Sequence, residues 1–245
     1  MSETKKLIYA GKAKDIFESE KENEVIIKFR DDITAGDGDK KDNLQEKGNY
    51  NSLISSKLFE ILENNGIKTQ YIKLIEVGSM LSKKLDMIPI EVICRNIATG
   101  SLLKKFPFEN NQKLEPSIIQ MDYKNDEYHD PMLNNEIAIA LGIVNQEDIN
   151  KIKTITRDIN KVLSEFLKEK GILLIDFKLE FGKDKDDNIV LGDEISPDTC
   201  RYWDINTLKT LDKDSFRRGQ DNVMGIYEEV CNRIVDEKDR ENWGI

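Results

Sequence analysis

The sequence predicts an α+β protein that is built in two lobes. Short strand-like segments fill residues 7–29, and a long helical pattern occupies residues 147–170. Apolar residues that alternate with polar ones indicate a strand, whereas apolar residues three or four positions apart indicate a helix. Because strands precede helices within each half, we expect antiparallel sheets with flanking helices, divided into a smaller lobe at 1–86 and a larger lobe at 87–245.

The smaller lobe is expected to consist mainly of strands. The predicted strands are 7–9, 15–17, 25–29, 71–77 and 80–84. The stretch 11–14 is predicted to be a turn, and the polar, glycine-containing stretch 31–42 is predicted to be a loop. A helix is expected from Asn43 to Asn64, because the sequence Asn-Asn-Gly then interrupts its apolar pattern.

The larger lobe is expected to combine strands with three helices. The predicted strands are 88–95, 114–121, 172–181 and 188–193, and the predicted helices are 134–141, 147–170 and 221–235. The helix at 147–170 carries a single apolar stripe, and Gly171 suits the left-handed backbone that commonly follows a helix. A charged tail is expected after the last helix.

Net charge and cysteine content restrict what the protein can bind and where it works. The formal net charge is −10, which disfavours a general nucleic-acid binder or a protein that binds anionic membranes. The three cysteines form no Cys-x-x-Cys pair, a pattern that fits a reducing compartment. Since the sequence has neither a signal-peptide pattern nor an apolar run of membrane-spanning length, we expect a cytoplasmic protein.

One unusual segment, 88–101, is apolar enough for a buried strand but contains Glu91 and Arg95. Buried charges are unfavourable unless they are paired or bind a ligand. Arginine binds phosphate bidentately, and the Thr-Gly-Ser turn that ends in Ser101 would open a helix with free N–H groups. The pattern therefore suggests a phosphate site, with the alternative that Ser101 caps the helix and Arg95 pairs with Glu91.

A second unusual segment, 174–182, alternates charged and apolar residues. Strand geometry places Asp176, Lys178 and Glu180 on one face and the apolar residues on the core face. If the next turn is centred on its polar residues, Glu180 lies opposite Asp193, and facing carboxylates become favourable when Mg²⁺ lies between them. The alternative is a solvent-exposed hairpin face on which Lys178 neutralises its neighbours.

Two further segments could contribute to a site for a charged ligand. The turn at 11–14 contains a glycine and two lysines that would suit a phosphate, although an ordinary β-turn is the alternative. The segment 192–203 places Arg201 among acidic and aromatic residues, with a loop in which Asp198 pairs with Arg201 as the alternative. The single histidine, His129, is interpreted as structural.

Taken together, these motifs resemble the phosphoribosylaminoimidazole-succinocarboxamide synthase (SAICAR synthetase) family of purine biosynthesis. The resemblance covers nearly the whole chain and rests on six motifs in the expected order. They are Y-A-G-K-A-K at 9–14, F-R-D-D-I-T-A-G-D-G at 29–38, I-P-I-E-V-I-C-R-N-I-A-T-G-S at 88–101, K-N-D-E-Y-H-D-P-M at 124–132, D-F-K-L-E-F-G at 176–182 and G-D-E-I-S-P-D-T-C-R-Y-W at 192–203. Two departures are visible: Gln-Glu-Lys-Gly at 45–48 replaces an expected Asp-Arg-Lys-Gly, and Cys200 stands where a serine is common.

The resemblance implies an ATP-dependent ligase that condenses carboxyaminoimidazole ribonucleotide (CAIR) with L-aspartate to form SAICAR, ADP and phosphate. It also implies a two-lobed fold related to ATP-grasp and kinase-like enzymes, with ATP between the lobes, a requirement for Mg²⁺, and a homo-oligomer, with a dimer favoured. A carboxylate does not condense with an amine unaided, so the expected route transfers the γ-phosphoryl group of ATP to the CAIR carboxylate. The alternative is a kinase that phosphorylates a small hydroxylated acceptor.

The resemblance further implies roles for individual residues. Nucleotide binding is implied for Gly11, Lys12, Ala13, Lys14, Lys124, Glu180 and Asp193, and Mg²⁺ binding for Glu180 and Asp193. CAIR binding is implied for Arg95, Ser101, Lys178 and Arg201. Catalytic roles are implied for Lys178, Asp198 and Asp37, and the loop at 34–40, which contains Asp37 and Gly38, is expected to close over the substrates.

Overall fold

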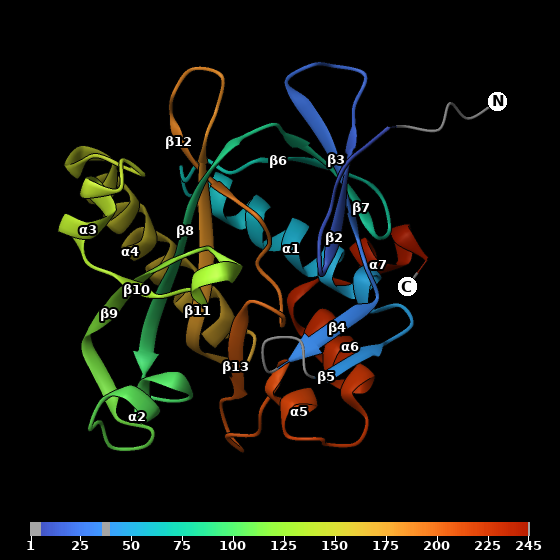
Figure 1. Cartoon of the computed structure of the whole chain (residues 1–245). Helices are drawn as coiled ribbons and strands as arrows, with labels where there is room; N and C mark the ends of the chain where they lie inside the picture. The colour runs from blue at the N-terminus through green and yellow to red at the C-terminus, as the bar shows by residue number, and fades with distance from the viewer. Residues whose placement is uncertain (1–5, 36–39, 245) are drawn as a thin grey trace.

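The computed structural model describes residues 6–35 and 40–244 and contains two antiparallel sheets and a separate two-stranded hairpin (Figure 1). The first sheet has the strand order β1 (Leu7–Ala10), β2 (Lys14–Glu18), β3 (Glu24–Phe29), β7 (Ser79–Lys83) and β6 (Tyr71–Glu76). The second sheet has the order β10 (Met132–Leu133), β9 (Lys113–Tyr123), β8 (Asp86–Ile97), β11 (Ile172–Lys183) and β12 (Ile189–Gly192), and β13 (Cys200–Asp204) pairs with β11. The sheets and their flanking helices confirm the predicted α+β class.

Helices cover the sheets on the side away from the viewer of Figure 1. The helices are α1 (Lys47–Asn64), α2 (Ser101–Lys105), α3 (Asn135–Ala140), α4 (Gln146–Glu169), α5 (Asp214–Arg217), α6 (Val223–Ile234), α7 (Glu237–Trp243) and a 3₁₀ helix at Asp126–Tyr128. Helix α1 packs against the first sheet and against α6, and α4 packs against β11. Of the helices in the described part of the chain, none combines the length and the apolar character needed to cross a bilayer.

Helix α4 and strand β11 form the main hydrophobic contact of the second sheet. Most of the predicted apolar stripe of α4 is buried, with Ile155, Val162 and Phe166 partly exposed. Leu163 and Ile159 at its centre are fully inaccessible to solvent. On β11 the predicted core face is also buried, including Phe177 and Phe181. The helix ends as predicted before Gly171, which has a φ of 74°. The periodicity of these two segments therefore predicted both the elements and the faces that meet.

Replacing Leu163 with alanine is expected to lower the free energy of unfolding by about 2–5 kcal/mol, because the fully buried side chain leaves a cavity between α4 and the sheet. Urea unfolding followed by circular dichroism measures the change. Lys161→Ala on the exposed face of the same helix is the matched control and should change stability by less than about 0.5 kcal/mol. Equal losses for both variants would contradict the assigned packing of α4.

The prediction that the stretch 31–42 is a loop is wrong for the residues of that stretch that the structure describes. It contains β4 (Asp32–Ala35) and β5 (Lys40–Asn43), which pair as an antiparallel hairpin. Ile33 on β4 is almost fully buried, and Lys40 on β5 donates a hydrogen bond to the carbonyl of Phe216 at 2.5 Å. These contacts with distant residues explain why polar composition misled the prediction. The helix expected from Asn43 begins at Lys47, after the hairpin.

Other elements of the C-terminal region were also missed. The loop considered around Arg201 is strand β13, in which Tyr202 is completely buried. The expected charged tail contains helix α7. Asp239 of this helix forms an ion pair with Lys57 of α1 at 3.0 Å. Short strands and helices of this kind depend on partners elsewhere in the chain, which local patterns do not reveal.

Each sheet is formed by one of the two predicted parts of the chain, but the two parts share a hydrophobic core. The first sheet uses residues 7–83 and the second uses residues 86–204, so the predicted boundary at 86/87 falls at the first residue of β8. One hydrophobic cluster nevertheless includes buried residues of both sheets. The division into two lobes therefore stays a prediction.

Candidate active site

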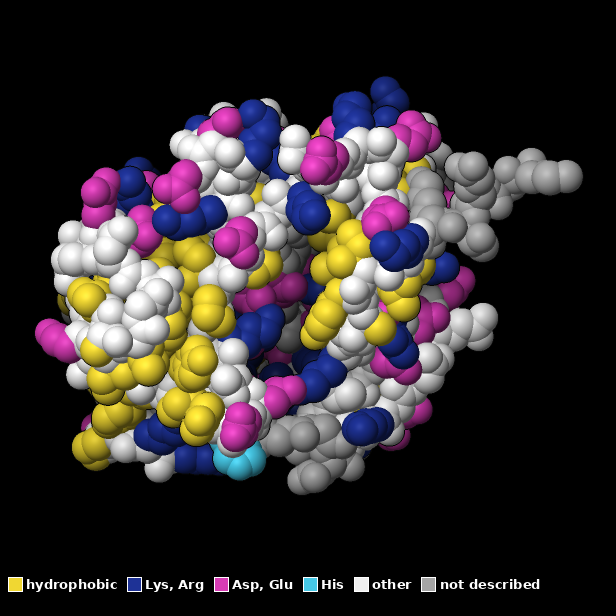
Figure 2. Space-filling view, turned by 45° about the horizontal axis from the view of Figure 1, so that its top comes forward, with side chains coloured by type: hydrophobic (Ala, Val, Ile, Leu, Met, Phe, Trp, Pro, Cys, Tyr) yellow, Lys and Arg dark blue, Asp and Glu magenta, His cyan; other side chains and the backbone are white. Residues whose placement is uncertain are grey.

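A polar cleft opens between the two sheets. Figure 2 shows a hollow in one face of the molecule, with acidic and basic side chains gathered at its base. Strand β11 crosses this region and carries Asp176, Lys178 and Glu180 on the face opposite its buried core residues. Asp176 and Glu180 are themselves only 4% exposed. The alternative of a solvent-exposed hairpin face is therefore wrong for these carboxylates.

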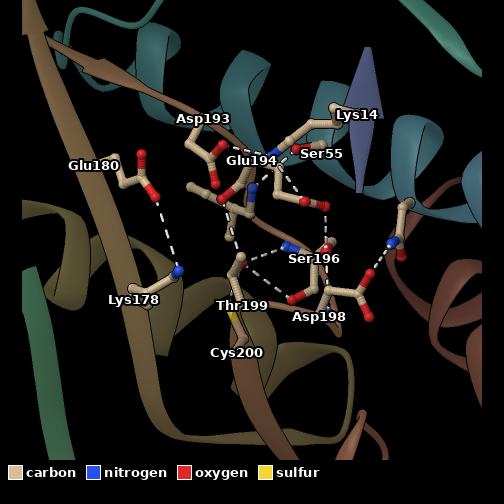
Figure 3. A network of polar contacts seen from close by, with 12 residues as sticks. Lys14, Ser55, Lys178, Glu180, Asp193, Glu194, Ser196, Asp198, Thr199 and Cys200 are labelled. Carbon is tan, nitrogen blue, oxygen red and sulfur yellow. Dashed lines mark hydrogen bonds and ion pairs between the residues drawn. The ribbon is translucent and has the colours of Figure 1, made fainter. Parts of the chain in front are cut away.

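At one end of the cleft, three carboxylates, those of Glu180, Asp193 and Glu194, lie among lysines (Figure 3). Lys14 donates to Asp193 at 2.5 Å and to Glu194 at 2.8 Å. Glu180 accepts from Lys124 at 2.6 and 2.5 Å, and Lys178 lies 3.7 Å from it. Strands β2 and β11 and the residues that directly follow β9 and β12 thus bring together side chains as distant in the sequence as Lys14 and Glu194, 180 positions apart.

The strand register differs by one residue from the prediction. Glu180 lies opposite Gly192 rather than opposite Asp193, which follows the end of β12. Asp193 has a φ of 59°, so its backbone is left-handed and the side chain leaves the regular alternation of the strand. The two carboxylates still influence each other, because the charge of Asp193 contributes to the raised pKa of Glu180.

The two carboxylates have opposite pKa shifts. Burial, together with the charge of Asp193, raises the pKa of Glu180, although Lys124 and Lys178 oppose the shift. Burial also disfavours ionisation of Asp193, but the charges of Lys14 and Lys178 outweigh it and lower its pKa. Carboxylates held this close in a buried cleft suit a hard divalent cation. Within residues 6–35 and 40–244 no group of three or more His, Cys, Asp or Glu side chains could hold a metal, so phosphate oxygens would have to complete the coordination.

At the other end of the cleft, two arginines converge on one aspartate. Arg95 lies 3.2 Å from Asp176, and Arg201 lies 2.9 Å from the same carboxylate oxygen. Arg95 also donates to the hydroxyl of Ser101 at 3.2 Å. A Cβ on Gly100 would lie 2.9 Å from the guanidinium of Arg201, and its φ of 59° also favours glycine. The predicted phosphate residues are thus brought together around Asp176.

The two arginines share Asp176, and Arg201 also contacts Asp214 at 3.0 Å. Burial lowers the pKa of Arg95, and the neighbouring charge of Arg201 contributes to the shift against the favourable field of Asp176. Arg95 is only 2% exposed. A phosphate monoester would accept bidentate hydrogen bonds from such guanidinium groups. The two alternatives considered from the sequence are wrong: Glu91 pairs with Lys178 at 2.6 Å, and helix α2 has Gly100 rather than Ser101 at its N-cap.

Asp198 lies in a network that the sequence did not predict. Its carboxylate accepts from Lys47 at 2.6 Å, from Asn51 at 2.9 Å and from Tyr227 at 2.7 Å. Burial opposes ionisation, but the charge of Lys47 and these hydrogen bonds hold the pKa of Asp198 far below its usual range. The considered pair between Asp198 and Arg201 is therefore wrong. The network ties α1 and α6 to the segment between β12 and β13.

The remaining predicted residues occupy less central positions. The turn at 11–14 is present, and a Cβ on Gly11 would lie 2.8 Å from the carbonyl oxygen of Lys14. Lys12 is exposed and pairs with Asp126 at 3.2 Å, outside the group formed around Glu180. Asp37 and Gly38 lie outside the described residues. Cys200 is a buried packing residue, and burial raises the pKa of its thiol to about 12.

Several residues of the site were missed by sequence reasoning. They are Lys47, Glu91 as a partner of Lys178, Asp176 as the bridge between the arginines, Glu194, Asp214 and Tyr227. Asp176 was visible in the charge alternation of β11, so its position on the site face was predictable while its partners were not. Lys47 and Tyr227 carry no local signal of a common site, because each meets Asp198 only through the tertiary fold.

Comparisons with known proteins agree with the motifs and the geometry. The family model described as SAICAR synthetase matches residues 7–234. The chain is 58% identical over 237 residues to the phosphoribosylaminoimidazole-succinocarboxamide synthase of Methanobrevibacter smithii, covering 96% of this chain and 98% of that protein. It is 55% identical over 238 residues to the protein of the same name from Methanothermobacter thermautotrophicus, covering 97% and 96%.

Solved structures show the same relationship. A SAICAR synthetase in complex with ADP matches with a TM-score of 0.91 at 44% identity, covering 94% of this chain and 97% of that one. The synthase from Ehrlichia chaffeensis matches with a TM-score of 0.91 at 44% identity, covering 94% and 98%. The similarity in fold therefore extends over 94% of this chain.

Proposed function

The chain belongs to the SAICAR synthetase family, and on that premise we infer its activity and propose how its cleft performs it. The family activity is the ATP-dependent ligation of CAIR and L-aspartate in purine biosynthesis, which yields SAICAR, ADP and phosphate. Family membership does not favour the alternative of a kinase with a small hydroxylated acceptor. The roles that we assign to individual residues of the cleft go beyond family membership and are proposals.

The observation that carries the proposal is the arrangement of strand β11. Asp176 holds the two arginines, and Glu180, four residues along the same strand, lies among the lysines. Lys178 lies between them and contacts both Glu91 and Glu180. A strand advances about 3.3 Å per residue, so a phosphate at the arginines and a nucleotide at Glu180 would be separated by roughly the length of a small ribonucleotide.

We propose that the arginine end binds CAIR and that the lysine end binds ATP. Arg95, Ser101 and Arg201 are placed to hold the phosphate of CAIR, and Lys178 is placed near its carboxylate. Lys14 and Lys124 are placed to contact ATP phosphates, with the turn at 11–14 beside them. The exposed side chain of Lys12 is assigned the outer edge of the nucleotide site.

We further propose that Glu180 and Asp193 hold Mg²⁺ together with ATP phosphate oxygens. Both are carboxylates in the same cleft, and the charge of Asp193 contributes to the raised pKa of Glu180, so a divalent cation between them would relieve their mutual repulsion. The bound ion would reduce the negative charge of the phosphates and so allow an anionic carboxylate to approach. The residues of the chain then need only position the groups that react.

In the proposed reaction, a CAIR carboxylate oxygen attacks the γ-phosphorus of ATP, and ADP leaves. The amine of L-aspartate then attacks the acyl carbon, phosphate leaves with the bridging oxygen, and the nitrogen loses a proton. Lys178 stabilises the negative charge that develops between the two substrates. Asp198 is ionised and has three donors, so we assign it to positioning the segment that carries Arg201 rather than to accepting a proton.

The lobes, the oligomeric state, the cellular location and the role of Asp37 are also proposals. We propose that the two sheets belong to two lobes, that the enzyme is a homodimer, and that it works in the cytoplasm. A catalytic role for Asp37 also remains a proposal from the family resemblance. None of these is needed for the assignment of the two ends of the cleft.

The activity is tested by supplying CAIR, L-aspartate and ATP with Mg²⁺ and following ADP and SAICAR together. Release of ADP is expected to require both co-substrates and to match SAICAR formation one for one, because the phosphoryl group activates the carboxylate that is joined. Omission of CAIR or of L-aspartate provides the controls. ADP release that proceeds with a sugar or another hydroxylated acceptor in place of CAIR would favour the kinase instead.

A further inference from the structure

Almost every cation described in the cleft already has a carboxylate partner. These partners are Asp193 and Glu194 for Lys14, Glu180 for Lys124, Glu91 for Lys178, Asp176 for Arg95, Asp176 and Asp214 for Arg201, and Asp198 for Lys47. Lys213 differs from them. Its ammonium group makes no ion pair within 4.0 Å and no hydrogen bond with any residue in 6–35 or 40–244.

Lys213 is held in place at the edge of the cleft. It directly precedes α5, and its backbone N–H donates to the carbonyl of Pro197 at 3.1 Å. Pro197 is next to Asp198 in the segment that leads to Arg201, so Lys213 adjoins both the Asp198 network and the arginine end. The backbone of Lys213 is therefore held beside the same segment that carries Arg201 of the proposed CAIR site.

The surroundings of Lys213 disfavour an uncompensated ammonium group. Burial lowers its pKa, and the charges of Arg217 and Lys47 add to this shift, whereas the carboxylates of Asp198 and Glu194 oppose it. Among the described residues Asp198 forms no hydrogen bond or ion pair with the ammonium group of Lys213; its oxygens accept instead from Lys47, Asn51 and Tyr227. A partly buried cation next to other cations becomes favourable when an anionic ligand binds there.

A second cation extends the same group. Arg217 projects from α5 and contacts Asp214, the carboxylate that also accepts from Arg201 at 3.0 Å. Its side chain is 40% exposed, so part of its guanidinium remains available to a ligand. Lys213 and Arg217 therefore form a basic group on the α5 side of the cleft, next to the arginine end and separate from the lysines around Glu180.

The reaction supplies an anion for this group. The proposed function assigns cations to the phosphates of ATP and to the phosphate and carboxylate of CAIR, but none to the two carboxylates of L-aspartate. We propose that Lys213, assisted by Arg217, binds a carboxylate of L-aspartate and so selects the acidic amino acid. This inference rests on the proposed function and names the binding group of its second substrate.

The test replaces Lys213 with methionine and compares steady-state constants for all three substrates. The KM for L-aspartate is expected to rise by about 10- to 150-fold, because a hydrogen bond to a charged group is lost. The KM values for ATP and CAIR should stay within about twofold, since their cations are unchanged. Lys213→Arg keeps the charge and should recover part of the affinity for L-aspartate.

Lys209→Met is the matched control, because Lys209 is exposed and lies four residues earlier in the same segment. It should leave all three KM values unchanged. Thermal unfolding separates binding from folding: Lys213→Met should not lower Tm, because the folded protein holds this charge less favourably than the unfolded chain does.

The outcomes distinguish the inference from the proposed function. If wild-type protein forms no SAICAR from CAIR, L-aspartate and ATP, the proposed function itself fails. If wild-type protein is active and Lys213→Met has an unchanged KM for L-aspartate, the function stands and the assignment of Lys213 is overturned. An equal rise in all three KM values would also overturn it, because that result indicates a general disturbance of the cleft.

Discussion

Replacing Arg95 with alanine is expected to weaken CAIR binding by about 30-fold to several thousand-fold, equivalent to about 2–5 kcal/mol. The side chain is 2% exposed, contacts Asp176 and Ser101, and belongs to the pair of guanidinium groups assigned to the phosphate of CAIR. The alanine variant lacks a buried guanidinium group that can donate two hydrogen bonds to phosphate. Of the two arginines that contact Asp176, Arg201 alone remains. Isothermal titration calorimetry with CAIR and, separately, with ATP and Mg²⁺ measures the effect on each ligand.

Binding of ATP should change by less than about threefold, because nucleotide binding is assigned to the other end of the cleft. Arg157→Ala, on the exposed face of α4, is the control for loss of an arginine elsewhere in the same sheet-and-helix unit and should leave both affinities unchanged. Equal losses of CAIR and ATP affinity in Arg95→Ala would mean that the two ends of the cleft have been assigned wrongly.

Glu180→Gln should reduce kcat by at least about 100-fold at every Mg²⁺ concentration, because an amide cannot replace a carboxylate that binds the metal. The fold should be retained. Burial raises the pKa of the Glu180 carboxyl, so the folded protein holds the ionised form less favourably than the unfolded chain does, and a neutral side chain of the same shape is tolerated. Turnover measured over a range of Mg²⁺ concentrations, with Tm measured in parallel, tests both statements.

The control for Glu180 is Glu115→Gln, because Glu115 lies on β9 with its side chain 72% exposed. That variant should show the Mg²⁺ dependence of the wild-type enzyme. If Glu180→Gln turns over at the wild-type rate when Mg²⁺ is limiting, Glu180 is not a metal ligand, and the proposed metal site loses one of its two carboxylates.

The sequence predicted the strand that organises the site better than it predicted the partners of that strand. Alternation along 174–182 correctly placed Phe177 on the core face and Glu180 on the site face, since a strand side chain can only point to one of two faces. The position of Asp193 was one residue off, because alternation does not fix the turn between β11 and β12 that sets the strand register, and Glu180 lies opposite Gly192. Periodicity therefore gives the face of a residue but not its distance from a residue on another strand.

The contacts that no local pattern could give are those between distant segments. Lys47 and Asp198 are 151 positions apart and pair through buried side chains, and the sequence alone suggested Arg201 as the partner of Asp198. No sequence pattern singled out Lys213, because a single lysine before a short helix has no local signal of a binding role. The family motifs identified the two ends of the cleft, and the three-dimensional contacts were needed to show which charges remain available to ligands.

Both ends of the cleft must act on one reaction if the proposed function is correct. An isotope experiment tests this most directly: CAIR labelled with ¹⁸O in its carboxylate is converted in the presence of L-aspartate, ATP and Mg²⁺, and the released phosphate is analysed by mass spectrometry. Transfer of the γ-phosphoryl group to the carboxylate predicts that each phosphate molecule carries one ¹⁸O atom. Unlabelled phosphate, formed while SAICAR accumulates, would contradict the proposed mechanism.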